Sequence, residues 1–163
     1  MKILTFGEIM IRMKTRGTER LFQSPLFEAT FGGGEANVAV SLANYGMDVS
    51  FFTILPKNAL GDECIRELRG FGVNVSHILR MPGRMGIYFI EVGANQLPSK
   101  VIYDREFSAI AMTDPQEVDW KSILTDYDWL HISGITPAIS ENAMKMTIDC
   151  VRTAKELGVK ISF

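Results

Sequence analysis

The chain has 163 residues, of which 47% are hydrophobic and 22% are charged, and its formal net charge is −2. This composition is typical of a soluble, cytoplasmic protein; the scattered lysines and arginines form no basic stripe with stacking aromatic side chains, which argues against nucleic acid as a partner. A membrane partner is not expected either, because Glu8 and Arg12 interrupt the apolar start of the chain.

Four short apolar runs predict strands buried between two layers of helices, at residues 2–6, 49–54, 129–133 and 159–163. Three helical patterns, each followed by a glycine, are expected at residues 36–45, 60–71 and 141–157. On the first of these helices, Val38, Leu42 and Tyr45 are expected to face the core. The alternation of strands and helices indicates an α/β fold, a layered sheet with helices on both faces.

Three consecutive glycines, Gly32 to Gly34, lead into the first helix, which carries Asn37 on its first turn. Glycines let main-chain N–H groups come close to a ligand, and the start of a helix favours negative charge. Asn37 adds a donor and an acceptor for hydroxyl groups. We therefore expect this turn to contact a polyhydroxylated or anionic small molecule. The alternative is that the glycines serve close packing alone.

This turn differs from two well-known phosphate-binding loops. A Walker loop requires Gly-Lys followed by Ser or Thr, and the sequence contains no Gly-Lys pair. A dinucleotide-binding fingerprint places its third glycine at position 37, which here is Asn37. The pattern therefore does not predict a nucleotide at this end of the chain.

Alternating residues at 86–92 and 100–105 predict a β-hairpin. Side chains two positions apart share a face of a strand, so Tyr103 and Arg105 lie together, and Tyr88 of the first strand can join them. Arg105 can hold a carboxylate through two parallel hydrogen bonds while the tyrosines pack against a sugar ring and bind hydroxyls. In the alternative, the tyrosines lie in a dimer interface and Arg105 pairs on the surface with one of its neighbours, Asp104 or Glu106.

Other polar residues have simpler explanations. Arg12 is a weaker candidate for substrate contact, because an ion pair between Glu8 and Arg12 explains both residues equally well. The acidic pair that opens the second helix is favoured there by the helix dipole, and we do not interpret it as catalytic. That acidic pair is Asp62 and Glu63. The two cysteines and the two histidines are expected to be structural rather than metal ligands, namely Cys64, His77, His131 and Cys150.

The glycine turn resembles the first signature of the phosphofructokinase-B, or ribokinase-like, family of carbohydrate kinases, in the residues Gly33, Gly34, Asn37, Ala39 and Gly46. The family pattern usually places another glycine ten residues later, where this chain has Pro56. Four further segments resemble the branch that contains 2-keto-3-deoxygluconate kinases and related fructokinases: FGEIMIRM, LPKNALGDE, GIYFIE and VIYDREFSAI. The resemblance runs from Met1 to Phe163.

The resemblance implies a truncated ribokinase-like layered sheet, the N-terminal part of a kinase domain over residues 1–163, with lid excursions at about 12–32 and 84–107. Members of this family are roughly twice as long, and their catalytic aspartate lies in a late Gly-Ala-Gly-Asp motif that this sequence does not contain. No catalytic, cofactor-binding or metal-binding residue is therefore assigned here. The residues implied to bind substrate are Gly33, Gly34, Asn37, Tyr88, Tyr103 and Arg105.

The implied activity is ATP- and magnesium-dependent phosphorylation of a small sugar or sugar acid, most specifically 2-keto-3-deoxygluconate, with fructose as the second choice. The chain alone is expected to be inactive and to bind neither ATP nor magnesium well. A homodimer through the lid sheet is expected, and the last predicted strand is expected to leave an apolar edge prone to association. The alternative is a noncatalytic sugar-binding or vestigial module that dimerises through the lid.

Overall fold

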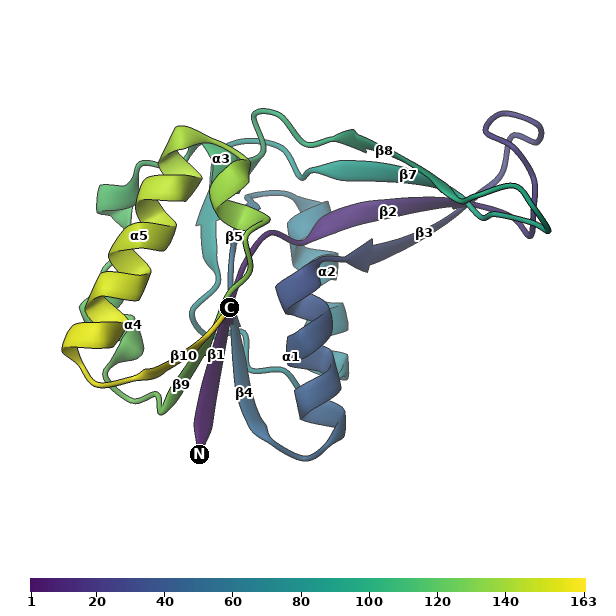
Figure 1. The fold of residues 1–163 in the computed structure, drawn as a ribbon. Helices are drawn as coiled ribbons and strands as arrows, with labels where there is room; N and C mark the ends of the chain where they lie inside the picture. The colour runs from purple at the N-terminus through teal and green to yellow at the C-terminus, as the bar shows by residue number, and fades with distance from the viewer.

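The computed structural model describes residues 1–163 and places one parallel sheet between two layers of helices (Figure 1). This main sheet has the strand order β10-β9-β1-β4, and all neighbouring strands in it are parallel. Its strands are β1 (Lys2–Phe6), β4 (Asp48–Phe52), β9 (Trp129–His131) and β10 (Lys160–Ser162). The predicted α/β class and the four strands of the main sheet are confirmed. The expected burial of the last strand was wrong, because β10 lies at the edge of the sheet, where Lys160 and Ile161 are exposed.

Helices cover both faces of the main sheet. On one side lie α1 (Gly34–Asn44) and α2 (Ala59–Gly70); on the other lie α3 (Ala109–Met112), α4 (Trp120–Leu124) and α5 (Glu141–Glu156) (Figure 1). Successive strand residues point to opposite faces, so Ile3 of β1 packs in the core beneath α1 and α2 while Leu4 packs in the core beneath α5. The sheet therefore carries two separate hydrophobic cores.

The aromatic side chains concentrate in the core on the α5 side. Phe6 and Phe52 are fully buried there, and their ring centroids lie 4.9 Å and 4.7 Å from that of Trp120. Aromatic rings bury more apolar area than any other side chains, so this cluster anchors β1 and β4 to α4.

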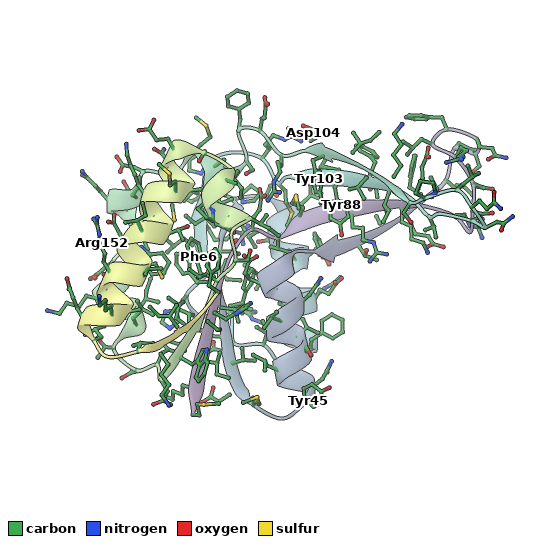
Figure 2. All side chains as sticks on the ribbon, in the orientation of Figure 1. Phe6, Tyr45, Tyr88, Tyr103, Asp104 and Arg152 are labelled. Carbon is green, nitrogen blue, oxygen red and sulfur yellow. The ribbon has the colours of Figure 1, made fainter.

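Local signals in the sequence set the helix ends. At the start of α2 the Asn58 side chain accepts a hydrogen bond from the N–H of Gly61, and at the start of α5 Ser140 accepts one from Ala143. After α5 the chain turns at Gly158, whose φ of +74° suits glycine. The three predicted helices are confirmed to within two residues. The expectation for Tyr45 was wrong, because its side chain is 82% exposed beyond the end of α1 (Figure 2).

A second, four-stranded sheet projects from the body of the molecule (Figure 1). Its order is β3-β2-β7-β8, built from β2 (Met10–Thr15), β3 (Phe27–Gly32), β7 (Ile87–Glu91) and β8 (Lys100–Asp104). Each half is an antiparallel pair, and the parallel contact between β2 and β7 joins the halves. We call this the projecting sheet. The predicted hairpin at 86–105 is confirmed; β2 was not predicted.

Several short elements also went unpredicted. The expected strand at 49–54 is divided at Thr53, and β5 (Ile54–Pro56) leaves the main sheet to pair with β6 (Leu79–Met81). Two 3₁₀ helices, η1 (Pro115–Glu117) and η2 (Thr136–Ala138), and the short α3 and α4 complete the chain. Elements of three to five residues are too short to show a periodic pattern. None of the helices combines the length and the apolar character needed to cross a membrane.

Candidate functional site

All six residues predicted to bind substrate line one pocket of about 160 Å³. The pocket lies between the start of α1 and the base of the projecting sheet, where Tyr88 and Tyr103 lie (Figure 2). The structure adds six further lining residues, namely Glu8, Met10, Gly32, Glu35, Val101 and Ile135. Residues far apart in the sequence therefore meet at one place.

The glycine turn forms the floor of this pocket. Gly33 is extended and packs so closely on the main chain that a Cβ there would overlap the carbonyl oxygen of Glu8. A Cβ on Gly32 would lie 2.6 Å from the Tyr88 hydroxyl, whereas one on Gly34 would make only an ordinary 3.6 Å contact with Ile135. Close packing thus explains the first two glycines, and the third leaves open space over the helix start.

The start of α1 supplies main-chain donors to this pocket. Its N-cap is Gly33, which has no side chain to bond the first amides, and the first intrahelical bond runs from Asn37 N–H to the Gly33 carbonyl at 2.8 Å. The N–H groups of the first turn lack intrahelical acceptors, and the helix dipole places partial positive charge there. The exposed side chain of Asn37 adds a donor and an acceptor beside them.

One acidic side chain in this first turn faces the interior instead. Glu35 is fully buried, and its carboxylate accepts a hydrogen bond of 2.5 Å from the Ser133 hydroxyl. The same hydroxyl accepts a hydrogen bond from the Ile135 N–H at 3.1 Å. Glu35 therefore ties the segment that follows β9, including the pocket residue Ile135, to the start of α1.

The two tyrosines of the pocket lie directly opposite each other on β7 and β8. Their ring centroids are 5.9 Å apart with an interplanar angle of 37°. Burial raises the pKa of Tyr88, an effect that the nearby Arg12 guanidinium partly offsets. The Tyr88 phenol therefore keeps its proton at neutral pH and can donate it to a ligand oxygen. The side chain of Tyr103 is 59% exposed.

Arg105 lies one residue beyond β8 and forms an ion pair with Glu8. Its Nε donates a hydrogen bond to Oε2 of Glu8 at 2.8 Å, and its Nη2 lies 2.5 Å from the same oxygen in the ion pair. The centre of the guanidinium lies 5.5 Å from the Tyr103 ring centroid, within the range of a cation–π contact. This contact overturns the predicted Glu8–Arg12 pair. It also overturns the alternative that Arg105 pairs with a neighbour, since Asp104 instead binds Arg84 at 2.7 Å and 2.8 Å.

Arg12 lies outside this pocket. It is opposite Tyr88 and Thr30 in the projecting sheet and lines a neighbouring pocket of about 500 Å³ between β3, α1 and α2. Asn37 lines both pockets. The ion pair considered for Arg12 is not formed, because β2 carries its side chain away from Glu8 toward this second pocket. Substrate contact by Arg12 stays a prediction.

The remaining titratable residues have structural partners. Asp62 forms an ion pair with Arg80 at 2.6 Å, and Glu63 forms one with its helix neighbour Arg66. Each acid therefore has its own arginine partner. His77 packs against Tyr127 with ring centroids 5.8 Å apart, and Nδ1 of His131 lies 2.9 Å from the Ser162 hydroxyl. No three His, Cys, Asp or Glu side chains are grouped so as to hold a metal ion.

The pocket's chemistry suits binding of an oxygen-rich ligand. It offers phenol hydroxyls, an amide, main-chain N–H groups and one guanidinium. Its two carboxylates, Glu8 and Glu35, are each buried and hydrogen-bonded to protein groups, so neither is placed to take a proton from a ligand. Sequence reasoning could have added Val101 from its period-two relation to Tyr103, but Ile135 lies in an irregular segment that carries no such signal.

Comparison with known proteins gives concordant matches. The family described as pfkB family carbohydrate kinase matches residues 1–162. The 2-dehydro-3-deoxygalactonokinase of Haloferax volcanii is 35% identical over 162 residues, covering 99% of this chain and 51% of that protein. The 2-dehydro-3-deoxygluconokinase of Thermoproteus tenax is 32% identical over 146 residues, covering 86% and 44%.

Solved structures agree with these sequence matches. The crystal structure of 2-dehydro-3-deoxygluconokinase from Thermotoga maritima superposes with a TM-score of 0.95 at 47% sequence identity, covering 99% of this chain and 49% of that one. The chain therefore spans about half the length of the relatives it matches.

Proposed function

Because the chain belongs to the pfkB family of carbohydrate kinases, we propose that it forms the substrate-binding part of an ATP-dependent kinase acting on 2-keto-3-deoxygluconate. The predicted ribokinase-like fold, a layered sheet with helices on both faces, is confirmed. In this proposal the projecting sheet is the lid, and the pocket beneath it holds the sugar acid.

The observation that carries the proposal is the convergence of Tyr88, Tyr103 and Arg105 over the start of α1. A sugar acid presents one carboxylate and several hydroxyls. The guanidinium binds the carboxylate, the phenols and Asn37 bind hydroxyls, and the first amides of the helix add donors for oxygen atoms. The names of the Haloferax volcanii and Thermotoga maritima relatives, which are kinases of 2-dehydro-3-deoxy (2-keto-3-deoxy) sugar acids, support this choice of substrate.

We propose that phosphoryl transfer needs residues outside these 163. Neither pocket carboxylate is free to act as a base, and no cluster of His, Cys, Asp or Glu side chains fits magnesium. The residues present thus do not fit ATP with its metal ion, and no transfer step is assigned to them. In this proposal the chain recognises the sugar and covers it, which excludes water from the site during transfer.

A second candidate is a noncatalytic sugar-binding or vestigial module that dimerises through the projecting sheet. Three consecutive residues of β8 favour it, since Val101, Ile102 and Tyr103 are 40%, 40% and 59% exposed. Dimerisation through this sheet is also compatible with the kinase proposal. The two buried free cysteines fit a reducing compartment, and we propose the cytoplasm.

Calorimetric titration of the chain with 2-keto-3-deoxygluconate and with fructose tests the proposal, together with a coupled assay for ADP. We expect the sugar acid to bind more tightly than fructose and no sugar-dependent ADP to form. Tighter binding of fructose would make fructose the proposed substrate in place of 2-keto-3-deoxygluconate. Binding of neither sugar would favour the vestigial module. Sugar-dependent ADP formation would contradict the assignment of transfer to residues outside the chain.

A further inference from the structure

Glu8 is a buried carboxylate at the junction of the main sheet and the projecting sheet. Its side chain is only 3% exposed. Its Oε1 accepts a hydrogen bond from the Ser108 hydroxyl at 2.7 Å, and its own N–H donates to the Thr136 hydroxyl at 3.3 Å. With Gly33 packed on its carbonyl oxygen, the position of Glu8 is fixed by several independent contacts.

The Glu8 carboxylate uses only part of the Arg105 guanidinium. An arginine has five N–H donors in a planar fork. The Oε2 atom of Glu8 accepts a hydrogen bond from Nε and lies 2.5 Å from Nη2 in the ion pair, and Nη1 has no hydrogen-bond partner in the protein. One face of the group lies near the Tyr103 ring. The edge of the guanidinium that carries Nη1 therefore has no partner in the protein, and Arg105 lines the pocket.

We propose that Glu8 is a positioning residue, which holds the Arg105 guanidinium so that its free edge binds the carboxylate of a sugar acid. This inference rests on the proposed function, and it adds the residue that sets the preference for an acid over an uncharged sugar. The ion pair carries no net charge, so the preference arises from the fixed direction of the remaining donors rather than from a general attraction for anions.

Removal of the Glu8 charge should release Arg105. The Arg105 side chain is 20% exposed, and a partly buried guanidinium without its carboxylate gains by turning its charged end into water. Once turned outward, it no longer presents the free edge to the pocket. Contacts with sugar hydroxyls from Tyr88, Asn37 and the helix amides do not depend on this pair.

The test is calorimetric titration of 2-keto-3-deoxygluconate and fructose into the wild-type chain and three variants. Glu8→Gln removes the charge but keeps the size. Ser108→Ala removes the hydroxyl that orients Oε1 and leaves both charges in place. Asp104→Asn is the matched control, because it breaks the neighbouring exposed pair with Arg84 without touching the pocket. Thermal unfolding of each unliganded variant reports on the fold.

We expect Glu8→Gln to weaken binding of the sugar acid about tenfold and Ser108→Ala about threefold, with fructose binding changed less than about twofold. Asp104→Asn should bind both sugars like the wild type. A purely structural role would weaken both sugars equally, and that result would overturn the inference. If Glu8→Gln fails to fold, equal losses for both sugars in Ser108→Ala would do the same. If the wild type binds neither sugar, the proposed function itself fails, and this inference with it.

Discussion

Arg105 carries the only cationic side chain among the residues that line the pocket, and it is also the partner of the buried Glu8. Its substitution should therefore affect stability as well as binding. Arg105→Ala leaves the Glu8 carboxylate buried without its counter-charge, and we expect the free energy of unfolding to fall by about 2 kcal/mol. Chemical denaturation measures this change.

A double variant separates the charge effect from lost packing. In Glu8→Gln/Arg105→Ala no uncompensated charge remains, so part of the stability should return relative to Arg105→Ala alone. A double variant that is less stable than both single variants would show that the pair does not couple as the geometry indicates.

The two cysteines give a prediction for alkaline pH. Burial raises the pKa of the Cys64 thiol to about 12 and raises the pKa of Cys150 as well. In the unfolded chain both thiols have a pKa of about 8.5. Above that pH the unfolded state therefore loses protons that the folded state keeps. The free energy of unfolding should then be unaffected below that pH and fall above it, by about 1.4 kcal/mol per pH unit for each thiol.

Denaturant titrations at pH 8 and pH 10 measure this decline, with Cys64→Ala as the comparison, which should show a shallower slope. In the native state at pH 8 both thiols should react slowly with a disulfide reagent. Fast reaction of either thiol without denaturant would contradict its burial.

At the scale of elements, two neighbouring glycines at the junction between β3 and α1 have different roles: Gly33 serves packing, and Gly34 borders the pocket. Gly33→Ala places a methyl group against the Glu8 carbonyl, and we expect a loss of about 2 kcal/mol in unfolding free energy. Gly34→Ala meets only Ile135, at 3.6 Å, so stability should stay within about 0.5 kcal/mol of the wild type.

The added methyl of Gly34→Ala projects into the open space at the helix start, so this variant should bind the sugar acid more weakly despite its normal stability. Denaturation and calorimetry on both variants make the comparison, each serving as control for the other. Equal stabilities for the two variants would refute the assignment of Gly33 to packing.

The main sheet and its long helices were predictable from the sequence, because apolar runs, capping residues and glycines are local signals. The hairpin of β7 and β8 was predictable for the same reason, and its period of two brought Tyr88, Tyr103 and Arg105 together. The strand β2 was missed because MIRMKT mixes apolar and basic residues without strict alternation. The partner of Glu8 was also missed, since it lies 97 residues away and depends on tertiary structure.

At the scale of the whole molecule, apolar surface remains open around β10, which is an edge strand of the main sheet. Phe163 is 83% exposed and Ile161 is 37% exposed. On the α1 side a mainly apolar groove of about 270 Å³ runs beside β9, lined by Met1, Ile3, Val38, Leu42, Met47, Trp129, His131 and Ser162. An open strand edge next to such a groove favours pairing with another chain.

We therefore expect the 163-residue chain to self-associate, with a sedimentation coefficient that rises with concentration. Ile161→Lys should weaken association by placing a charge at the edge strand. Ile148→Lys is the matched control, since Ile148 is 40% exposed on α5 and lines a hollow beside η1 rather than the groove next to the edge strand. A wild-type chain that stays monomeric at all concentrations would contradict this expectation.

The projecting sheet is joined to the body by four short chain segments, which enter and leave at residues 7–9, 32–34, 82–86 and 105–108. Glu8 belongs to the first of them, and each of the other three comes close to it, through Gly33, Gly86 and the pair Arg105 and Ser108. A rigid rotation of the sheet against the body has its pivot where all its connections meet. Displacement grows with distance from a pivot, so the far loops of the sheet sweep the widest arc while Arg105 hardly moves. In the proposed kinase, the Arg105 end of the pocket therefore stays assembled whichever way the sheet turns. A sugar acid can then bind there by its carboxylate before the rest of the site closes over it.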